Sequence, residues 1–294
     1  MASANNGAMT AFSIVARRFF FAPFLLLLVL APAMARAQDR AQALLQFEGV
    51  QARYQAAYAP GAVARDAREL LEPADQAIAD SALKALDRAA ARSFDVAASV
   101  AAIQQEVAAA GKGAAAPSPQ VVTAVARFAQ LRADYAAKDR AAKFEFFNRE
   151  RAKPVDPART ELLERMAVAD MREVDFSSQL LLSSVVKQLA RGNAGQFTSL
   201  PDRTLDMAVD TLWSRGVTSP RPRNLLTVAR ELEKQVTQAL LAALPDADVA
   251  ALLAWRNDPH AAAEREALLG AYRAEVKASG AVAIRTMVRG WPRS

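Results

Sequence analysis

The chain has 294 residues, a formal net charge of +6, no cysteine and a single histidine, His260. The lack of cysteine excludes disulfides, thiolate metal sites and lipid attachment through a cysteine. With one histidine, neither a histidine-based catalytic triad nor a multi-histidine metal centre can form within one chain. We therefore expect no metal and no cofactor, and we expect packing alone to stabilise the fold.

Residues 1–37 have the pattern of an export signal. Arg17 and Arg18 precede an apolar run that two prolines interrupt, and Ala35-Arg36-Ala37 follows it as a small-residue cleavage pattern. The run is short for a membrane-spanning helix, which needs about 20 residues, and its prolines would break such a helix. We expect cleavage after Ala37 and a periplasmic or secreted mature chain, 38–294, for which nucleic acid is not an expected partner.

The rest of the sequence predicts an all-α fold. Alanine is abundant, glycine and proline fall mostly between periodic segments, and no stretch shows sustained period-two alternation. We expect a multi-helix bundle or helical array of seven to nine helices. Residues 111–119 combine glycine with proline, and they mark a linker or loop between an N-terminal helical region, 38–110, and a C-terminal helical domain, 120–294.

In chain order, the first predicted helix carries its stripe at steps of three and four and ends at Pro60. This stripe consists of Leu44, Phe47, Gln51, Tyr54 and Tyr58. A later helix, which ends at Gly111, has a stripe of Val96, Val100, Ile103 and Val107. The spacing then predicts one long helix over 120–151 and another over 157–192, which begins at an Asp156-Pro157 cap.

The predicted buried face of the helix over 157–192 consists of Leu163, Ala167, Met171, Val174, Ser178, Leu181, Val185 and Leu189. Ser199 is expected to cap the next helix, which Gly216 ends, and Asn224 is expected to begin another. The face assigned to this last helix consists of Leu225, Val228, Leu232, Val236, Ala239 and Ala243. A short helix over 246–256 follows. The final helix, after Pro259, has a face of Leu269, Tyr272, Val276, Gly280, Ile284, Met287 and Trp291.

Residues 248–259 form an acidic, aliphatic-rich helix that is followed by a helix-breaking proline. The segment contains Trp255 near its end and closes with Asp258 and Pro259. This arrangement resembles a family of proteobacterial periplasmic all-helical domains of unknown function, in which an aromatic residue precedes Ser-Pro and then Gly-Gln. Trp255 and Pro259 match that pattern, whereas Asp258 replaces the serine and Ala261-Ala262 replaces Gly-Gln.

The helix Glu161–Met166 is also similar to the opening helix of that family, so the resemblance covers about residues 157–275. The resemblance implies a periplasmic, all-helical domain. The resemblance assigns no functional residue in this chain, because the family has no assigned catalytic residues.

Two local patterns are compatible with catalysis. Ser184 and Lys187, like Ser81 and Lys84, have the Ser-x-x-Lys spacing of penicillin-recognising acyl enzymes, but the companion Ser-x-Asn and Lys-Thr-Gly elements are absent. Glu145 lies between two phenylalanines, and desolvation there would suit the general acid of a cell-wall hydrolase. An exposed carboxylate between core-facing rings explains the same pattern, so we assign no catalytic residue.

The strongest local binding pattern is a cluster of arginines. Arg215, Arg221 and Arg223 surround a proline-rich turn before the helix that is expected to begin at Asn224. Guanidinium groups beside unpaired helix amides form an anion site suited to phosphate or an acidic sugar. These three residues are our predicted anion-binding site.

Two further charged patterns have alternative interpretations. Asp202, Asp206 and Asp210 recur every four residues, and they form either a solvated face or a face for a cation or a basic partner. The C-terminal tail is basic and carries an aromatic residue, and it either contacts an anionic surface or is a frayed terminus. It consists of Arg285, Arg289, Trp291 and Arg293.

These observations predict an exported envelope protein that acts by binding or assembly rather than by catalysis. Its expected partner is an unknown envelope protein or an anionic envelope surface. One alternative is peripheral binding of anionic lipid or cell-wall polymer, for which the positive net charge is suitable. The other alternative is a cell-wall hydrolase.

Overall fold

The structure is a computed structural model that describes residues 35–57, 76–93, 95–154, 156–188, 198–218 and 220–290. Helices make up most of these ranges, which contain no strand, and this confirms the all-α prediction. The same ranges contain twelve helices, so the expected number of seven to nine is wrong. Breaks inside predicted helices account for much of the difference. Most of the predicted export signal lies outside the described residues.

The first helix covers residues 35–48, and α2 (Val50–Ala57) follows it directly. The remaining helices are, in chain order, α4 (Gln76–Ser93), α5 (Val96–Ala110), α6 (Pro119–Ala137), α7 (Arg140–Arg151), α8 (Pro157–Arg165), α9 (Val168–Gln188), α11 (Asp202–Thr218), α12 (Pro220–Ala242), α13 (Asp246–Arg256) and α14 (Ala261–Arg289).

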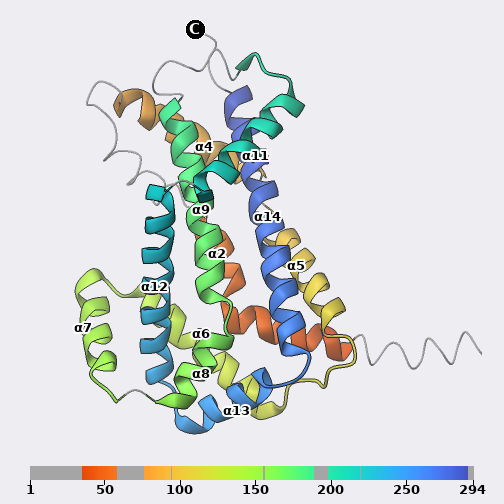
Figure 1. The fold of residues 1–294 in the computed structure, drawn as a ribbon, viewed down its shortest axis with the longest axis vertical. Coiled ribbons are helices and arrows are strands. Elements are labelled where there is room, and N and C mark those ends of the chain that lie inside the picture. Colours follow the sequence, from red (N-terminus) through yellow and green to blue (C-terminus); the bar gives the residue numbers. More distant parts are fainter. Residues whose placement is uncertain are drawn as a thin grey trace, which may run out of the picture.

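Three long helices, α9, α12 and α14, run along the long axis of the molecule (Figure 1). Helix α14 packs against α4, α5 and α9, and α12 packs against the other side of α9. At the lower end in Figure 1, α13 packs against both α6 and α8, whereas α4 and α11 lie at the upper end.

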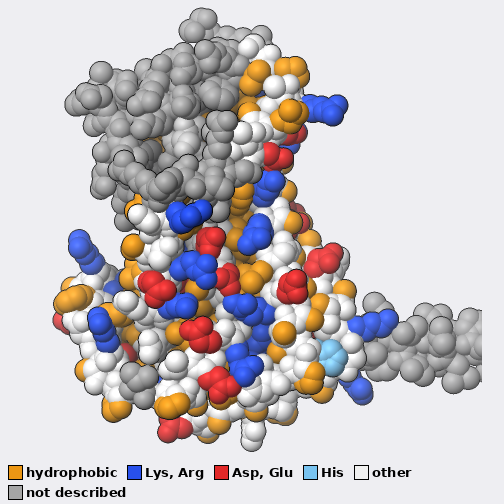
Figure 2. All heavy atoms as spheres, viewed as in Figure 1, with side chains coloured by type: hydrophobic (Ala, Val, Ile, Leu, Met, Phe, Trp, Pro, Cys, Tyr) orange, Lys and Arg blue, Asp and Glu red, His pale blue; other side chains and the backbone are white. Residues whose placement is uncertain are grey.

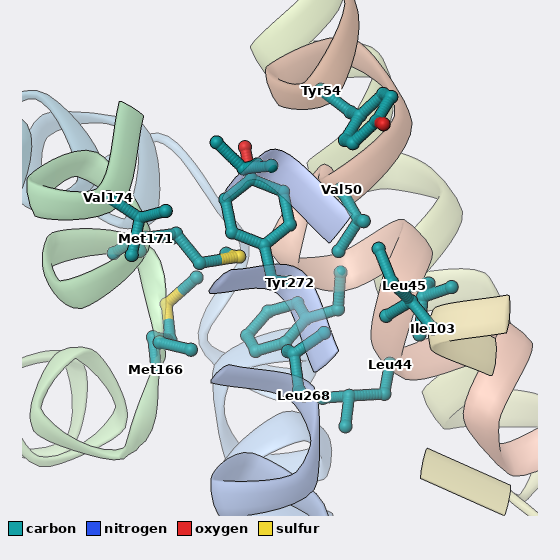
Figure 3. Packing of buried hydrophobic residues seen from close by; sticks show 14 of the residues in the cluster. Leu44, Leu45, Val50, Tyr54, Ile103, Met166, Met171, Val174, Leu268 and Tyr272 are labelled. Carbon is teal, nitrogen blue, oxygen red and sulfur yellow. The ribbon is translucent and has the colours of Figure 1, made fainter. Parts of the chain in front are cut away.

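The helices share a hydrophobic core that extends from Ala37 to Val288. In Figure 3, Met171 and Val174 of α9 lie on one side of Leu268 and Tyr272 of α14, and residues of the first helices lie on the other. The stripe predicted for α9 is buried as expected at every member that the structure describes. The segment 111–118 connects α5 to α6, and both of these helices contribute to the core.

The first predicted helix is broken at Gly49. Its φ is 70°, which is a backbone conformation that favours glycine. A Cβ built at this position would also overlap the guanidinium of Arg132, so a larger residue would force this flexible side chain to move. The break changes the phase of the helix, so that Val50 is buried and Gln51, which was assigned to the apolar stripe, is exposed.

The single helix expected over 120–151 is also wrong, because α6 ends at Ala137 and α7 begins at Arg140. Asp139 causes the second start: its carboxylate accepts a hydrogen bond from the amide of Ala142 at 2.8 Å. The sequence contains this cap, but the apolar periodicity continues through it.

The single helix expected over 157–192 is divided between α8 and α9. Asp156 caps α8 as predicted, and its carboxylate accepts a hydrogen bond from Ala158 at 3.0 Å. The start of α9 depends on a residue far away in the chain. The amide of Ala167 donates a hydrogen bond to the buried carboxylate of Glu48 at 3.0 Å. A cap supplied by a residue so far away in the chain has no local sequence signal.

Two helix boundaries in the C-terminal half differ from the prediction. Helix α11 begins at Asp202 and continues through Gly216, so Ser199 does not begin it and the glycine does not end it. Helix α12 begins at Pro220 rather than at Asn224. Proline suits the first turn of a helix because it lacks an amide that would need a partner there.

The face assigned to the start of α12 is wrong. Leu225, Val228 and Leu232 are 44%, 64% and 57% exposed, whereas the adjacent Leu226 and Ala229 are buried. Apolar residues occur in neighbouring positions here, so the sequence allows two faces, and packing against α9 selects the other one. Farther along the helix, Ala239 is buried as expected.

The three aspartates of α11 face basic residues of α14. Asp202 pairs with Arg289 at 2.7 Å, Asp206 with Arg285 at 3.4 Å, and Asp210 with Lys277 at 2.9 Å. The basic partner considered for this ladder is therefore a helix of the same chain. Because these pairs tie the end of α14 to α11, the interpretation of Arg285 and Arg289 as part of a frayed terminus is wrong.

Ion pairs also connect the long helices. Arg230 of α12 binds Asp170 at 2.9 Å and Glu173 at 2.7 Å, both on α9. Arg265 of α14 also pairs with Asp170. Basic and acidic side chains are interspersed over this face in Figure 2. Within the part of the chain that the structure describes, no helix has the length and apolar character needed to cross a membrane.

Candidate functional site

An open groove of about 660 Å³ lies between the first two helices, α5 and α6. Its polar lining consists of Gln42, Gln46, Gln51, Gln55 and Gln104. Its apolar lining consists of Leu45, Ala52, Val100, Ala129, Ala133 and Ala136. Gly49 and Arg132 complete the described lining, in which the arginine is the only charged residue.

The break at Gly49 brings two glutamine pairs to the same groove. Gln42 and Gln46 are four residues apart on the first helix, and Gln51 and Gln55 are four apart on α2. In an uninterrupted helix, the five-residue step from Gln46 to Gln51 would turn the second pair away by about 140°. The positive φ at Gly49 corrects this mismatch, so all four exposed amides line the groove.

The chemistry of the lining suits a polar ligand without a strong requirement for charge. Each glutamine amide both donates and accepts hydrogen bonds, which matches the hydroxyl and acetamido groups of sugars. Ala129, Ala133 and Ala136 of α6 add an apolar surface to the lining, against which the apolar face of a sugar ring can pack. The volume of about 660 Å³ is within the range of about 300–1,000 Å³ that small-molecule sites occupy.

Arg132 is the unusual member of the lining. Its two terminal nitrogens are buried and have no hydrogen-bond partner, and its guanidinium carbon lies 4.7 Å from the centre of the Phe128 ring. Burial, reinforced by the positive charge of Arg53, lowers the pKa of Arg132 to about 10. The guanidinium therefore still carries its charge at neutral pH.

Of the acidic groups near Arg132, Glu233 and Asp175 face Arg53, whereas Glu48 keeps one buried oxygen, Oε2, that has no hydrogen-bond partner among the described residues. Arg53 forms an ion pair with Glu233 and lies 3.8 Å from the carboxylate of Asp175. Burial raises the pKa of Glu48, and the strongest opposing influence on that carboxyl is Arg256. Arg132 thus shares its surroundings with acids, but it makes no ion pair with them among the described contacts.

A second buried network positions the first helix, which carries two of the five groove glutamines. Arg40 donates to Glu264 of α14 at 2.5 and 3.1 Å, and Arg256 lies 3.5 Å from the same carboxylate. Both guanidinium groups also lie over the ring of Trp255, at 5.7 and 5.5 Å from its centre. Arg40, Arg256 and Glu264 are each at most 2% exposed, so this network is structural.

A buried carboxyl links α9 to α14 near these charges. The hydroxyl of Tyr272 donates to Asp175 at 2.5 Å. Burial raises the pKa of Asp175 to about 6, although Arg53 and the Tyr272 hydrogen bond act in the opposite direction. No pocket among those described is lined by Asp175, so we treat the group as structural.

The predicted arginine site is only partly described. The side chains of Arg215 and Arg221 lie outside the described residues, and Arg223 is exposed. Because α12 begins at Pro220, Arg221 and Arg223 belong to its first turn rather than to a preceding loop. Arg223 is not among the described residues that line the groove.

The residues considered for catalysis lie apart from the groove. Ser184 is exposed and donates a hydrogen bond to the carbonyl of Leu180 at 2.8 Å, and the side chain of Lys187 lies outside the described residues. Glu145 is exposed on α7. Nδ1 of His260 lies 3.0 Å from Asp258. No cluster of acidic or histidine side chains within the described ranges could hold a metal ion.

Sequence reasoning missed the groove, although two signals for it exist. The pairs Gln42/Gln46 and Gln51/Gln55 repeat the same spacing on either side of a glycine. Arg132 lies four residues after the buried Phe128, so it continues the buried face of α6. A charged residue at such a position marks either a buried ion pair or a binding site.

The described residues thus define an all-helical protein with an open, glutamine-lined groove whose lining includes Arg132, a cation with buried terminal nitrogens. No protein-family model, curated protein or solved structure matches the chain.

Proposed function

We propose that the protein is exported to the cell envelope and acts there by binding. Support for export comes from the charged and apolar pattern of residues 1–37. The similarity of residues 248–259 to periplasmic helical domains is consistent with this location.

We further propose that the groove binds a cell-wall glycan. The observation that carries this proposal is the combination of five glutamine amides with an alanine-rich apolar surface. Amides satisfy hydroxyl and acetamido groups without the desolvation cost of a charged lining. Glu145 lies outside the groove lining, so the arrangement favours binding of a wall polymer over its hydrolysis.

Export predicts a defined mature end. When the full chain is expressed in a Gram-negative host, we expect periplasmic protein whose first residue is Gln38, because the cleavage pattern ends at Ala37. Intact mass spectrometry of the periplasmic fraction measures this. A mass that retains residues 1–37, or a protein confined to the cytoplasm, would contradict the proposal.

Glycan binding predicts co-sedimentation of the mature protein with purified peptidoglycan sacculi. The double variant Gln46→Ala/Gln55→Ala should bind the sacculi about 5- to 150-fold more weakly, because each lost hydrogen bond to a ligand costs about 0.5–1.5 kcal/mol. The matched control is Gln105→Ala/Gln120→Ala, which changes two exposed glutamines outside this groove. Melting curves of both variants should stay close to that of the wild type.

Sedimentation with anionic liposomes distinguishes glycan binding from lipid binding at the arginine site. If the protein sediments with anionic liposomes rather than with sacculi, and Arg221→Gln/Arg223→Gln abolishes this, the arginine site is the functional one and the groove proposal is wrong. If neither material binds the protein, glycan binding is also wrong, and assembly with an envelope protein becomes the hypothesis to pursue.

A further inference from the structure

The charge on Arg132 has no counterion that contacts it within the described structure. The terminal nitrogens lack hydrogen-bond partners. The guanidinium carbon lies over the face of Phe128, 4.7 Å from the centre of the ring. A buried charge without a counterion is costly for a folded protein. The guanidinium would therefore gain more from an anion than an exposed arginine would.

The neighbouring carboxylates do not supply that anion. Glu233 is paired with Arg53, and Oε1 of Glu48 accepts a hydrogen bond from the amide of Ala167 at 3.0 Å, while Oε2 of Glu48 is buried and makes no hydrogen bond, to Arg132 or to any other described group. Neither carboxylate forms an ion pair with Arg132, although both lie close enough to favour its charged form. The positive charge of Arg53 adds to the local excess.

Arg132 is positioned to contact a ligand that binds in the groove. Arg132 forms part of the groove lining, and its guanidinium lies against Gly49, which also lines the groove. Rotation of the flexible side chain would exchange the Phe128 ring for an anion bound in the groove. A guanidinium binds carboxylate through two parallel hydrogen bonds, which adds direction to the attraction.

We propose that Arg132 makes the groove selective for a sugar that carries a carboxylate, such as an acetamido sugar with an acidic side group. The glutamines would bind the hydroxyl and acetamido groups, while Arg132 binds the carboxylate at the wall. This inference rests on the proposed glycan-binding function, and it adds the chemical class of the sugar.

Two disaccharides that differ in one acidic group test the inference. N-acetylglucosaminyl-N-acetylmuramic acid and neutral diacetylchitobiose share two acetamido-sugar rings, but only the first carries a lactyl carboxylate. By isothermal titration, the wild type should bind the acidic disaccharide at least about tenfold more tightly, which is the gain expected from one charge-assisted hydrogen bond. This preference should decrease as salt is added.

The variant Arg132→Gln should lose the preference and keep the affinity for diacetylchitobiose. Arg132→Lys, which retains a charge without the two-pronged geometry, should keep part of the preference. The control Arg127→Gln removes an exposed arginine of the same helix and should leave both affinities unchanged. Circular dichroism and melting curves establish that each variant is folded.

The outcomes distinguish this inference from the proposed function. If the wild type binds both disaccharides equally, or if Arg132→Gln keeps the preference, the role of Arg132 is wrong while glycan binding stands. If neither disaccharide binds and sacculi do not bind either, both proposals are wrong.

Discussion

Changing Glu264 to glutamine is expected to destabilise the protein by about 3–5 kcal/mol, the usual cost of removing one partner from a buried ion pair. The substitution keeps the size of the side chain but leaves Arg40 and Arg256 without the carboxylate that they share. All three side chains are at most 2% exposed, so water cannot replace the lost charge. Urea denaturation monitored by circular dichroism measures the change in unfolding free energy.

Glu266→Gln is the matched control, because Glu266 is an exposed residue of the same helix. We expect this control to lie within about 0.5 kcal/mol of the wild type, as surface substitutions usually do. If Glu264→Gln also unfolds like the wild type, the three side chains do not form the buried network that the structure shows.

Relative to the wild type, the variant Asp175→Asn is expected to be more stable at neutral pH than at acidic pH. The pKa of Asp175 is raised from 3.8 to about 6 in the folded protein, so ionisation of this carboxyl opposes folding. The cost is fully present above about pH 6, decreases as the pH falls, and is absent well below the unfolded value of about 4. Asparagine carries no charge at any of these pH values, and it can still accept the Tyr272 hydrogen bond.

The stability difference between Asp175→Asn and the wild type should therefore shift by about 2 kcal/mol in favour of the variant between about pH 4.5 and about pH 7.5. Comparing the two proteins cancels the titration of all other carboxyls that they share. Urea denaturation at both pH values measures the shift. Asp87→Asn, which changes an exposed carboxyl, should show no such shift. An equal difference at both pH values would mean that Asp175 titrates normally.

The sequence was most informative where local chemistry determines the structure. Asp156 caps a helix as its position before a proline predicts, and the short helix over 246–256 has the expected limits. The stripe through Val174 and Leu181 is buried because its period matches the helix, and the neighbouring Leu182 is buried beside it. Apolar residues spaced at the helical period could therefore be placed correctly.

The prediction was wrong where the deciding contact comes from a distant part of the chain. The start of α9 depends on Glu48, which lies 119 residues before Ala167. The buried face of α12 depends on packing against α9, since Leu225 and Leu226 are equally apolar neighbours. The groove depends on a positive φ at Gly49, and the sequence alone does not show which glycine adopts one.

The contact between Arg40 and Glu264 also constrains the order in which the protein can fold. The two residues are 224 positions apart, yet the first belongs to the opening helix and the second to the closing one. A chain that emerges with its amino terminus first holds an unpaired Arg40 until α14 has been delivered. Contacts of such long range slow folding, because the intervening loop must close before they form. Early segments should therefore remain unfolded until synthesis or translocation ends, and they would need protection from aggregation during that interval.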